Sequence, residues 1–191
     1  MTMVLGDLLA MIRQDYLDTL RAVAYEAAAQ GQTVVLEPQA TPAEPALGVV
    51  AWHDLARQGK AVTVTSEGVF AFPNRIRFGW GDPLPGQPEP LQVVVQPFAW
   101  DAMPITLQTP RGQVLNLTPL AQWLAQWGAE PDSAAQAEDV FGREVVHSLR
   151  QTGPATWVAD LGTAPLEAWQ DLLEALLAAG ASQAIFGAPQ G

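Results

Sequence analysis

Residues 3–30 read MVLGDLLAMIRQDYLDTLRAVAYEAAAQ, the longest stretch of the chain with one regular apolar pattern. Its apolar side chains recur at helical spacing: Leu5, Leu8, Leu9, Ile12, Tyr16, Leu20 and Val23. Most charged side chains fall elsewhere, which is typical of a helix with one buried face. Gly31 provides a stop signal. We therefore predict one long amphipathic helix that needs a partner for its apolar side.

The middle of the chain is predicted to be rich in β-strands. Between residues 69 and 80 the large apolar side chains share one parity and Arg75 and Arg77 take the other, with a break at Pro73-Asn74. This alternation indicates a strand with one buried face. Further strands are expected over 33–36, 91–98 and 103–109. Pro97 and Pro104 place the last two at strand ends or at a sheet edge.

The last third is predicted to be mainly helical. In order, we expect a helix capped by Thr118 and ended by Gly128, another helix within 130–150 that is interrupted near Gly142, a strand over 156–161, a helix over 165–179 and a strand over 183–186. The order of elements lacks regular βα alternation. It predicts a single α+β domain, residues 1–191, in which the long N-terminal helix packs on a mainly antiparallel sheet. The helical C-terminal third should end in a strand–helix–strand unit.

Composition excludes several classes of function. The chain has 9 basic and 20 acidic side chains, a net charge of −11, and no cysteine. Binding to nucleic acids or anionic membranes depends on basic clusters, so neither partner is expected. The absence of cysteine excludes disulfides and thiolate metal sites. Because no export signal or long apolar run is recognised, we expect a cytoplasmic protein.

No motif for catalysis or cofactor binding stands out. Gly79-Trp80-Gly81 runs into prolines instead of a helix N-terminus, and the only lysine, Lys60, lacks the glycine spacing of a phosphate-binding loop. No serine lies in a nucleophile elbow. The sequence therefore predicts neither an enzyme nor a cofactor.

Metal binding is also not expected. Glu144 and His147 are three residues apart on an expected helix, but a di-iron bundle needs two such pairs and more carboxylates. The other imidazole, His53 beside Asp54, is expected on the far side of the sheet. We interpret the glycine and threonine of Asp160-Leu161-Gly162-Thr163 as the turn and cap of the following helix.

Tryptophans next to acidic residues, and an acidic helix stripe, are the candidate partner-binding features. Trp80 with Asp82, and Trp100 with Asp101, suit recognition of a basic protein surface, although a packed core is the alternative for each tryptophan. Glu167, Asp171 and Glu174 form one stripe on the exposed side of the helix over 165–179. A solvated helix face is the alternative for the stripe.

These observations favour a non-catalytic, acidic protein-binding domain. Its profile fits a bacterial immunity protein, an antitoxin-like inhibitor or a secretion chaperone that covers a basic surface of a toxin or secreted effector. The alternative is a small carboxylate-dependent enzyme or ligand-binding domain that uses Glu144, His147 and Asp160. A deep cleft that gathers these three side chains would favour the enzyme. A convex acidic face with exposed tryptophan would favour the binding protein.

Overall fold

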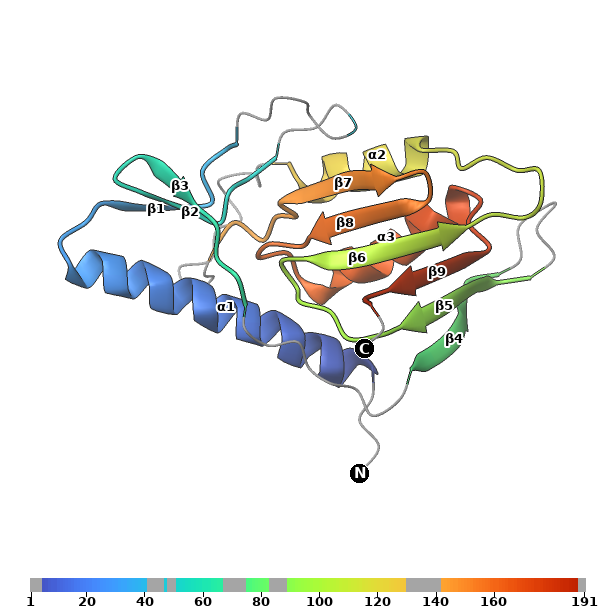
Figure 1. Ribbon diagram of the computed structural model, residues 1–191, viewed down its shortest axis with the longest axis horizontal. Coiled ribbons are helices and arrows are strands. Elements are labelled where there is room, and N and C mark those ends of the chain that lie inside the picture. Colours follow the sequence, from blue (N-terminus) through green and yellow to red (C-terminus); the bar gives the residue numbers. More distant parts are fainter. Residues whose placement is uncertain are drawn as a thin grey trace.

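A computed structural model describes residues 5–40, 47, 51–66, 75–82, 89–129 and 142–188 of the chain. These residues form the predicted α+β fold (Figure 1). The helices are α1 (Leu5–Ala29), α2 (Thr118–Trp127) and α3 (Leu166–Ala178). The strands are β1 (Val34–Leu36), β2 (Leu55–Arg57), β3 (Lys60–Val62), β4 (Ile76–Trp80), β5 (Leu91–Val95), β6 (Met103–Gln108), β7 (Ser148–Gly153), β8 (Thr156–Asp160) and β9 (Gln183–Phe186).

The strands form two sheets. A three-stranded antiparallel sheet has the order β1-β2-β3, and a six-stranded sheet has the order β4-β5-β9-β6-β8-β7. Among the described strands only β5 and β9 pair in parallel, so the prediction of a mainly antiparallel sheet is confirmed. The C-terminal strand–helix–strand unit, β8-α3-β9, is also confirmed. Its two strands are not adjacent, because β6 pairs with both of them.

Helix α1 joins the small sheet to the rest of the molecule. It contacts β1 of the three-stranded sheet and also α3, and it runs along one side of the molecule (Figure 1). Five of the seven apolar residues that the sequence pattern marked are buried, among them Leu8, Ile12 and Leu20, whereas the other two are half-buried. The guanidinium of Arg13 donates to the carbonyl oxygens of Thr163 and Ala164, at 2.9 and 2.7 Å, and so fastens α1 to the loop before α3.

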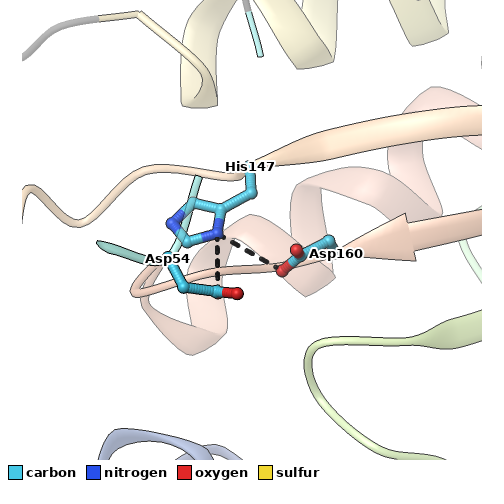
Figure 2. A group of neighbouring side chains, drawn as sticks. All are labelled: Asp54, His147 and Asp160. Carbon is cyan, nitrogen blue, oxygen red and sulfur yellow. Dashed lines mark ion pairs between the residues drawn. The ribbon is translucent and has the colours of Figure 1, made fainter. Parts of the chain in front are cut away.

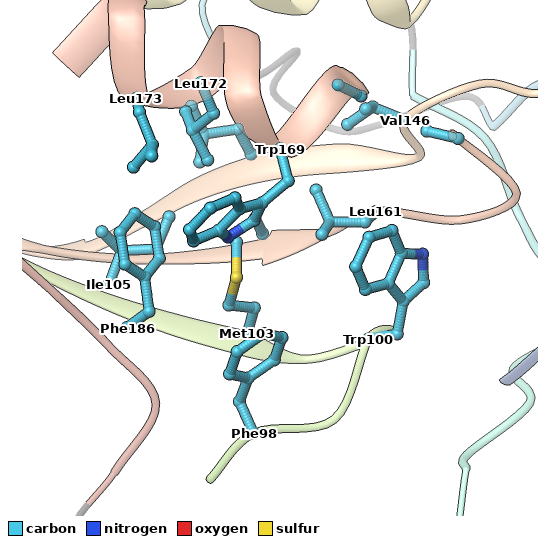
Figure 3. Close-up of a cluster of buried hydrophobic side chains, with 14 of the residues drawn as sticks. Phe98, Trp100, Met103, Ile105, Val146, Leu161, Trp169, Leu172, Leu173 and Phe186 are labelled. Carbon is cyan, nitrogen blue, oxygen red and sulfur yellow. The ribbon is translucent and has the colours of Figure 1, made fainter. Parts of the chain in front are cut away.

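The main core lies between the six-stranded sheet and α3. Met103, Ile105 and Leu107 alternate with more exposed residues along β6, which leaves one face of the strand buried. Figure 3 shows α3 laying Trp169 and its leucines against this face. The rings of Trp169 and Phe186 have centroids 5.3 Å apart. In Figure 1, α2 and α3 both lie behind the sheet.

The prediction of a helix within 130–150 is wrong for residues 142–150, the part of this range that the structure describes. Residues 142–147 are irregular and β7 begins at Ser148, whereas residues 130–141 lie outside the described part. Positive φ angles at Gly142 and Glu144, 91° and 59°, are incompatible with a helix. The N–H of Val146 instead donates to Trp127 and that of His147 to Asp160. This error matters for function, because it placed His147 on the wrong kind of element.

Two smaller expectations change as well. Thr118 is the first residue of α2 rather than its cap, and its N–H donates to Asn116 Oδ1 at 3.1 Å. Thr163 does not cap α3, whose N-cap position is Pro165. The expected break at Pro73-Asn74 lies outside the described residues.

Candidate functional site

His147 is the centre of a buried polar cluster at the junction of the two sheets. Its side chain is fully buried, and it immediately precedes β7. Glu37 follows β1, Asp54 precedes β2 and Asp160 ends β8. The expected separation of residues 53–54 from His147 is wrong, because the Trp52 N–H donates to the His147 carbonyl oxygen at 3.1 Å. Ends of strands from both sheets therefore meet around one imidazole.

On one side of the ring, Nε2 donates to Glu37 Oε1 at 2.8 Å. A carboxylate oxygen accepts the hydrogen bond of a ring N–H, so we assign the proton of this contact to Nε2. Glu37 is itself fully buried and takes further bonds from the Thr163 hydroxyl, at 2.5 Å, and from the Arg143 N–H. Thr163 Oγ1 in turn accepts the Val145 N–H. This side of the ring is completely hydrogen-bonded.

On the other side, two aspartates flank Nδ1. The distance from Nδ1 to Asp54 Oδ1 is 3.3 Å and to Asp160 Oδ1 is 3.5 Å (Figure 2, dashed lines). Neither oxygen lies where a ring N–H would make a well-directed hydrogen bond, so Nδ1 is a buried nitrogen without a hydrogen-bond partner. Nδ1 therefore faces two carboxylate oxygens at once.

Other groups hold both aspartates in place. Asp54 Oδ1 accepts from the Tyr16 hydroxyl at 2.6 Å, and its Oδ2 accepts from the Val64 N–H at 2.8 Å. Asp160 Oδ1 accepts from the Gly162 N–H at 3.0 Å. Asp54 is 4% exposed, whereas the Asp160 side chain is 24% exposed and provides the cluster with access to solvent.

Burial and charge shift the pKa values in this cluster in different directions. Burial works to lower the pKa of His147, but the adjacent carboxylates of Asp160, Asp54 and Glu37 outweigh it and raise that pKa well above its usual value. Burial raises the pKa of Asp160. Burial opposes ionisation of Asp54 too, yet the adjacent imidazole of His147 and the hydrogen bonds from Tyr16 and Val64 leave its pKa lowered. Burial and the charge of Asp54 raise the pKa of Tyr16.

The cluster can hold a positive charge. One imidazole lies within hydrogen-bond or ion-pair distance of three carboxylates, so a proton on Nδ1 or a metal cation beside it would be strongly favoured. Of the three candidates for an enzyme, the structure brings His147 and Asp160 together, but Glu144 is exposed and takes no part. Sequence reasoning missed Glu37, Asp54, Tyr16 and Thr163.

The acidic stripe on α3 lies beside a shallow groove between α2 and α3. Gln122, Gln126, Asp171 and Glu174 supply its polar lining, and we call this surface the acidic groove. Trp127 Nε1 and Gln126 Nε2 donate to Asp171 Oδ2, at 3.1 and 3.3 Å. Within the described part of the chain, no lysine or arginine lies within ion-pair distance of Asp171 or Glu174.

Trp80 reaches the same stripe from the edge of the large sheet. It is half-buried in β4, and its Nε1 donates to Glu174 Oε1 at 3.0 Å. The acidic partner of Trp80 is therefore Glu174 and not Asp82, the neighbour in sequence, whose side chain is exposed. Glu167 is exposed one turn before Asp171. Trp80 and the three acids of the stripe thus belong to one side of the molecule.

Trp100 and Asp101 do not lie on this surface. Trp100 is fully buried, and its Nε1 donates to the Gly162 carbonyl oxygen at 3.0 Å. Asp101 is half-buried and accepts a 2.5 Å bond from the Ser66 hydroxyl, and burial raises its pKa. Trp100 is therefore a packed core residue, the alternative that the sequence left open. Neither Trp100 nor Asp101 belongs to the acidic groove.

A scan against protein-family models gave no match, and searches of the curated proteins and of the solved structures gave none either. No helix among the described residues, α1 included, has the length and apolar character needed to cross a membrane. The class that the fold and site define is an α+β domain with a buried histidine–carboxylate cluster and an acidic helical surface.

Proposed function

We propose that this protein is a non-catalytic binding protein whose acidic groove covers a basic surface of a partner protein. The observation that carries the proposal is the pair of carboxylates of Asp171 and Glu174, which lie beside a shallow groove without a basic neighbour in the described residues. An immunity protein, antitoxin or secretion chaperone would act in this way on a toxin or secreted effector.

The tryptophans support this proposal by ordering the carboxylates. Bonds from Trp127 to Asp171 and from Trp80 to Glu174 hold each acid in one position. An ordered charge loses less conformational entropy on binding than a freely rotating one. Charge complementarity then increases the association rate more than it increases affinity.

The net charge of the molecule supports the same proposal. From residue 113 onward the sequence has nine acidic and two basic side chains, and the first 112 residues have eleven and seven. The acidic groove thus lies in the more negative part of the chain. A basic partner would be attracted over several ångströms before any contact forms.

A second candidate, a small carboxylate-dependent enzyme, is favoured by the contact between His147 and the desolvated Asp160. Such an enzyme would need its substrate to reach the imidazole, which is fully buried. Only Asp160 offers a partly exposed carboxylate in the cluster. The shallow acidic groove is the more accessible surface, and we place the binding function there.

Capture from an extract of the source organism tests the proposal. Three baits are compared. They are the wild type, a groove variant with Asp171→Asn and Glu174→Gln, and a control with Asp18→Asn and Glu26→Gln on α1. The control variant removes the same amount of negative charge as the groove variant. We expect a partner with an excess of lysine and arginine on the wild type and control baits and its loss from the groove variant. Equal capture by all three baits would overturn the proposal.

A further inference from the structure

We propose that Asp54, His147 and Asp160 bind a divalent metal cation, for which Zn²⁺ is the best fit, and that this ion ties the small sheet to the large one. The proposal concerns the buried cluster and is independent of the acidic groove. It also departs from the expectation of no metal, which assumed that residues 53–54 and His147 lie far apart.

The spacing of the three donor atoms suits one cation. Nδ1 of His147 lies 3.3 Å from Asp54 Oδ1 and 3.5 Å from Asp160 Oδ1, and all three donors lie within 4.8 Å of one another. Ligands bound to tetrahedral zinc at about 2.0–2.1 Å are about 3.3 Å apart. The three side chains converge on a common point from three different segments (Figure 2).

The orientation of the imidazole is the second, independent observation. The ring is fully buried, and its Nδ1 has no hydrogen-bond partner although it faces two carboxylates. Because Nε2 donates to Glu37 at 2.8 Å, Nδ1 is the nitrogen that faces Asp54 and Asp160, and a cation bound there would replace the proton that these carboxylates favour. A histidine that donates one ring N–H to a carboxylate and offers the other nitrogen is the usual arrangement of a metal ligand.

The carboxylates are held as metal ligands commonly are. Tyr16 and the Val64 N–H fix the two oxygens of Asp54, and the Gly162 N–H fixes Asp160. Outer hydrogen bonds of this kind orient ligands before the metal arrives. The Asp160 side chain is 24% exposed, so the cluster is in contact with solvent on that side.

The charge and chemistry of the donors select the class of ion. Three carboxylates around one imidazole leave excess negative charge in a buried place, which a divalent cation offsets. A donor set that mixes imidazole nitrogen with carboxylate oxygen favours zinc over magnesium or calcium, which prefer oxygen alone. The ligands come from the ends of β2, β7 and β8, so the ion would join the two sheets.

Calorimetric titration of the full-length, untagged, chelator-treated protein with ZnCl₂ tests the proposal. The test variant is Asp160→Asn, whose amide oxygen can still accept the Gly162 N–H. The matched control is Asp101→Asn, which changes another half-buried aspartate outside the cluster. We expect the wild type and the control to bind one Zn²⁺ per chain. Asp160→Asn should weaken Zn²⁺ binding by more than about 10–100-fold, the usual loss when a residue that only supports a metal ligand is changed. No binding by the wild type, or equal binding by Asp160→Asn, would overturn the proposal.

Long-range ¹H–¹⁵N NMR of the imidazoles gives a readout that does not depend on any cluster variant. The chain has two histidines, and His53→Gln assigns the signals. With Zn²⁺ added, we expect the Nδ1 resonance of His147 to move to the position of a metal-bound nitrogen while Nε2 keeps its proton. If both nitrogens are protonated and Zn²⁺ leaves them unchanged, the cluster is a buried imidazolium–carboxylate network and the proposal is wrong.

Discussion

Gly162 lies against the imidazole of His147 at a position that excludes a side chain. Its φ is +52°, and a Cβ there would lie 2.3 Å from His147 Cδ2. A left-handed backbone costs about 1–2 kcal/mol and overpacking about 1–3 kcal/mol, so Gly162→Ala should lower the free energy of unfolding by about 2–5 kcal/mol. Gly112→Ala is the control, because Gly112 also has positive φ but has open space around it. Equal losses in urea unfolding would show that the contact with His147 is unimportant.

The two tyrosines provide a matched pair for the same cluster. Tyr16 is fully buried and its hydroxyl donates to Asp54 at 2.6 Å, whereas Tyr25 is 69% exposed. Tyr16→Phe leaves a buried carboxylate oxygen without this donor, so we expect a loss of about 1–3 kcal/mol of unfolding free energy. Tyr25→Phe should change it by less than about 0.5 kcal/mol. Thermal unfolding of both variants checks the difference, and similar values would contradict the importance of this bond.

The members of the cluster could not be predicted as a set. Tyr16, Glu37, Asp54, His147 and Asp160 come from five separate segments, and no local spacing relates them. Tyr16 gave only a partial signal, since a hydroxyl on the apolar face of a helix needs a buried partner. The acidic stripe was predictable because its three residues share one helix, where spacing fixes the face.

At the scale of elements, the periodicity of apolar residues predicted the longer helices and strands. The apolar pattern of α1 and α3 and the alternation in β4 and β6 gave nearly correct bounds. The β2–β3 hairpin was missed because its strands are three residues each, too short for a periodic pattern. The region around His147 was misassigned because tertiary bonds to Trp127 and Asp160 outweigh its local preference.

The hairpin makes a prediction about turn chemistry. Gln58 and Gly59 connect β2 to β3, with φ angles of 50° and 76°, which defines a type I′ turn. Asparagine tolerates the first of these positions better than glutamine. Gln58→Asn should therefore raise the unfolding free energy by about 0.5–1 kcal/mol. Chemical denaturation measures the change in unfolding free energy, and a destabilised variant would contradict this description of the turn.

At the scale of the whole molecule, two features are spatially separate. The buried cluster joins the two sheets, whereas the acidic groove lies between α2 and α3 on the outside. Substitutions in the groove should therefore leave the fold intact, because Asn and Gln oxygens still accept the indole N–H groups of Trp127 and Trp80. The proposed binding function can accordingly be tested without disturbing the core.

The most direct test of the binding proposal is the association rate of the captured partner at two ionic strengths. The groove variant combines Glu167→Gln, Asp171→Asn and Glu174→Gln, and the control combines Asp7→Asn, Asp18→Asn and Glu26→Gln on α1. At about 10 mM salt, where charges interact over about 30 Å, we expect the groove variant to associate about tenfold more slowly than the control. At about 150 mM the difference should shrink. Equal association rates for the two variants at low salt would contradict the proposal that the acidic groove binds the partner.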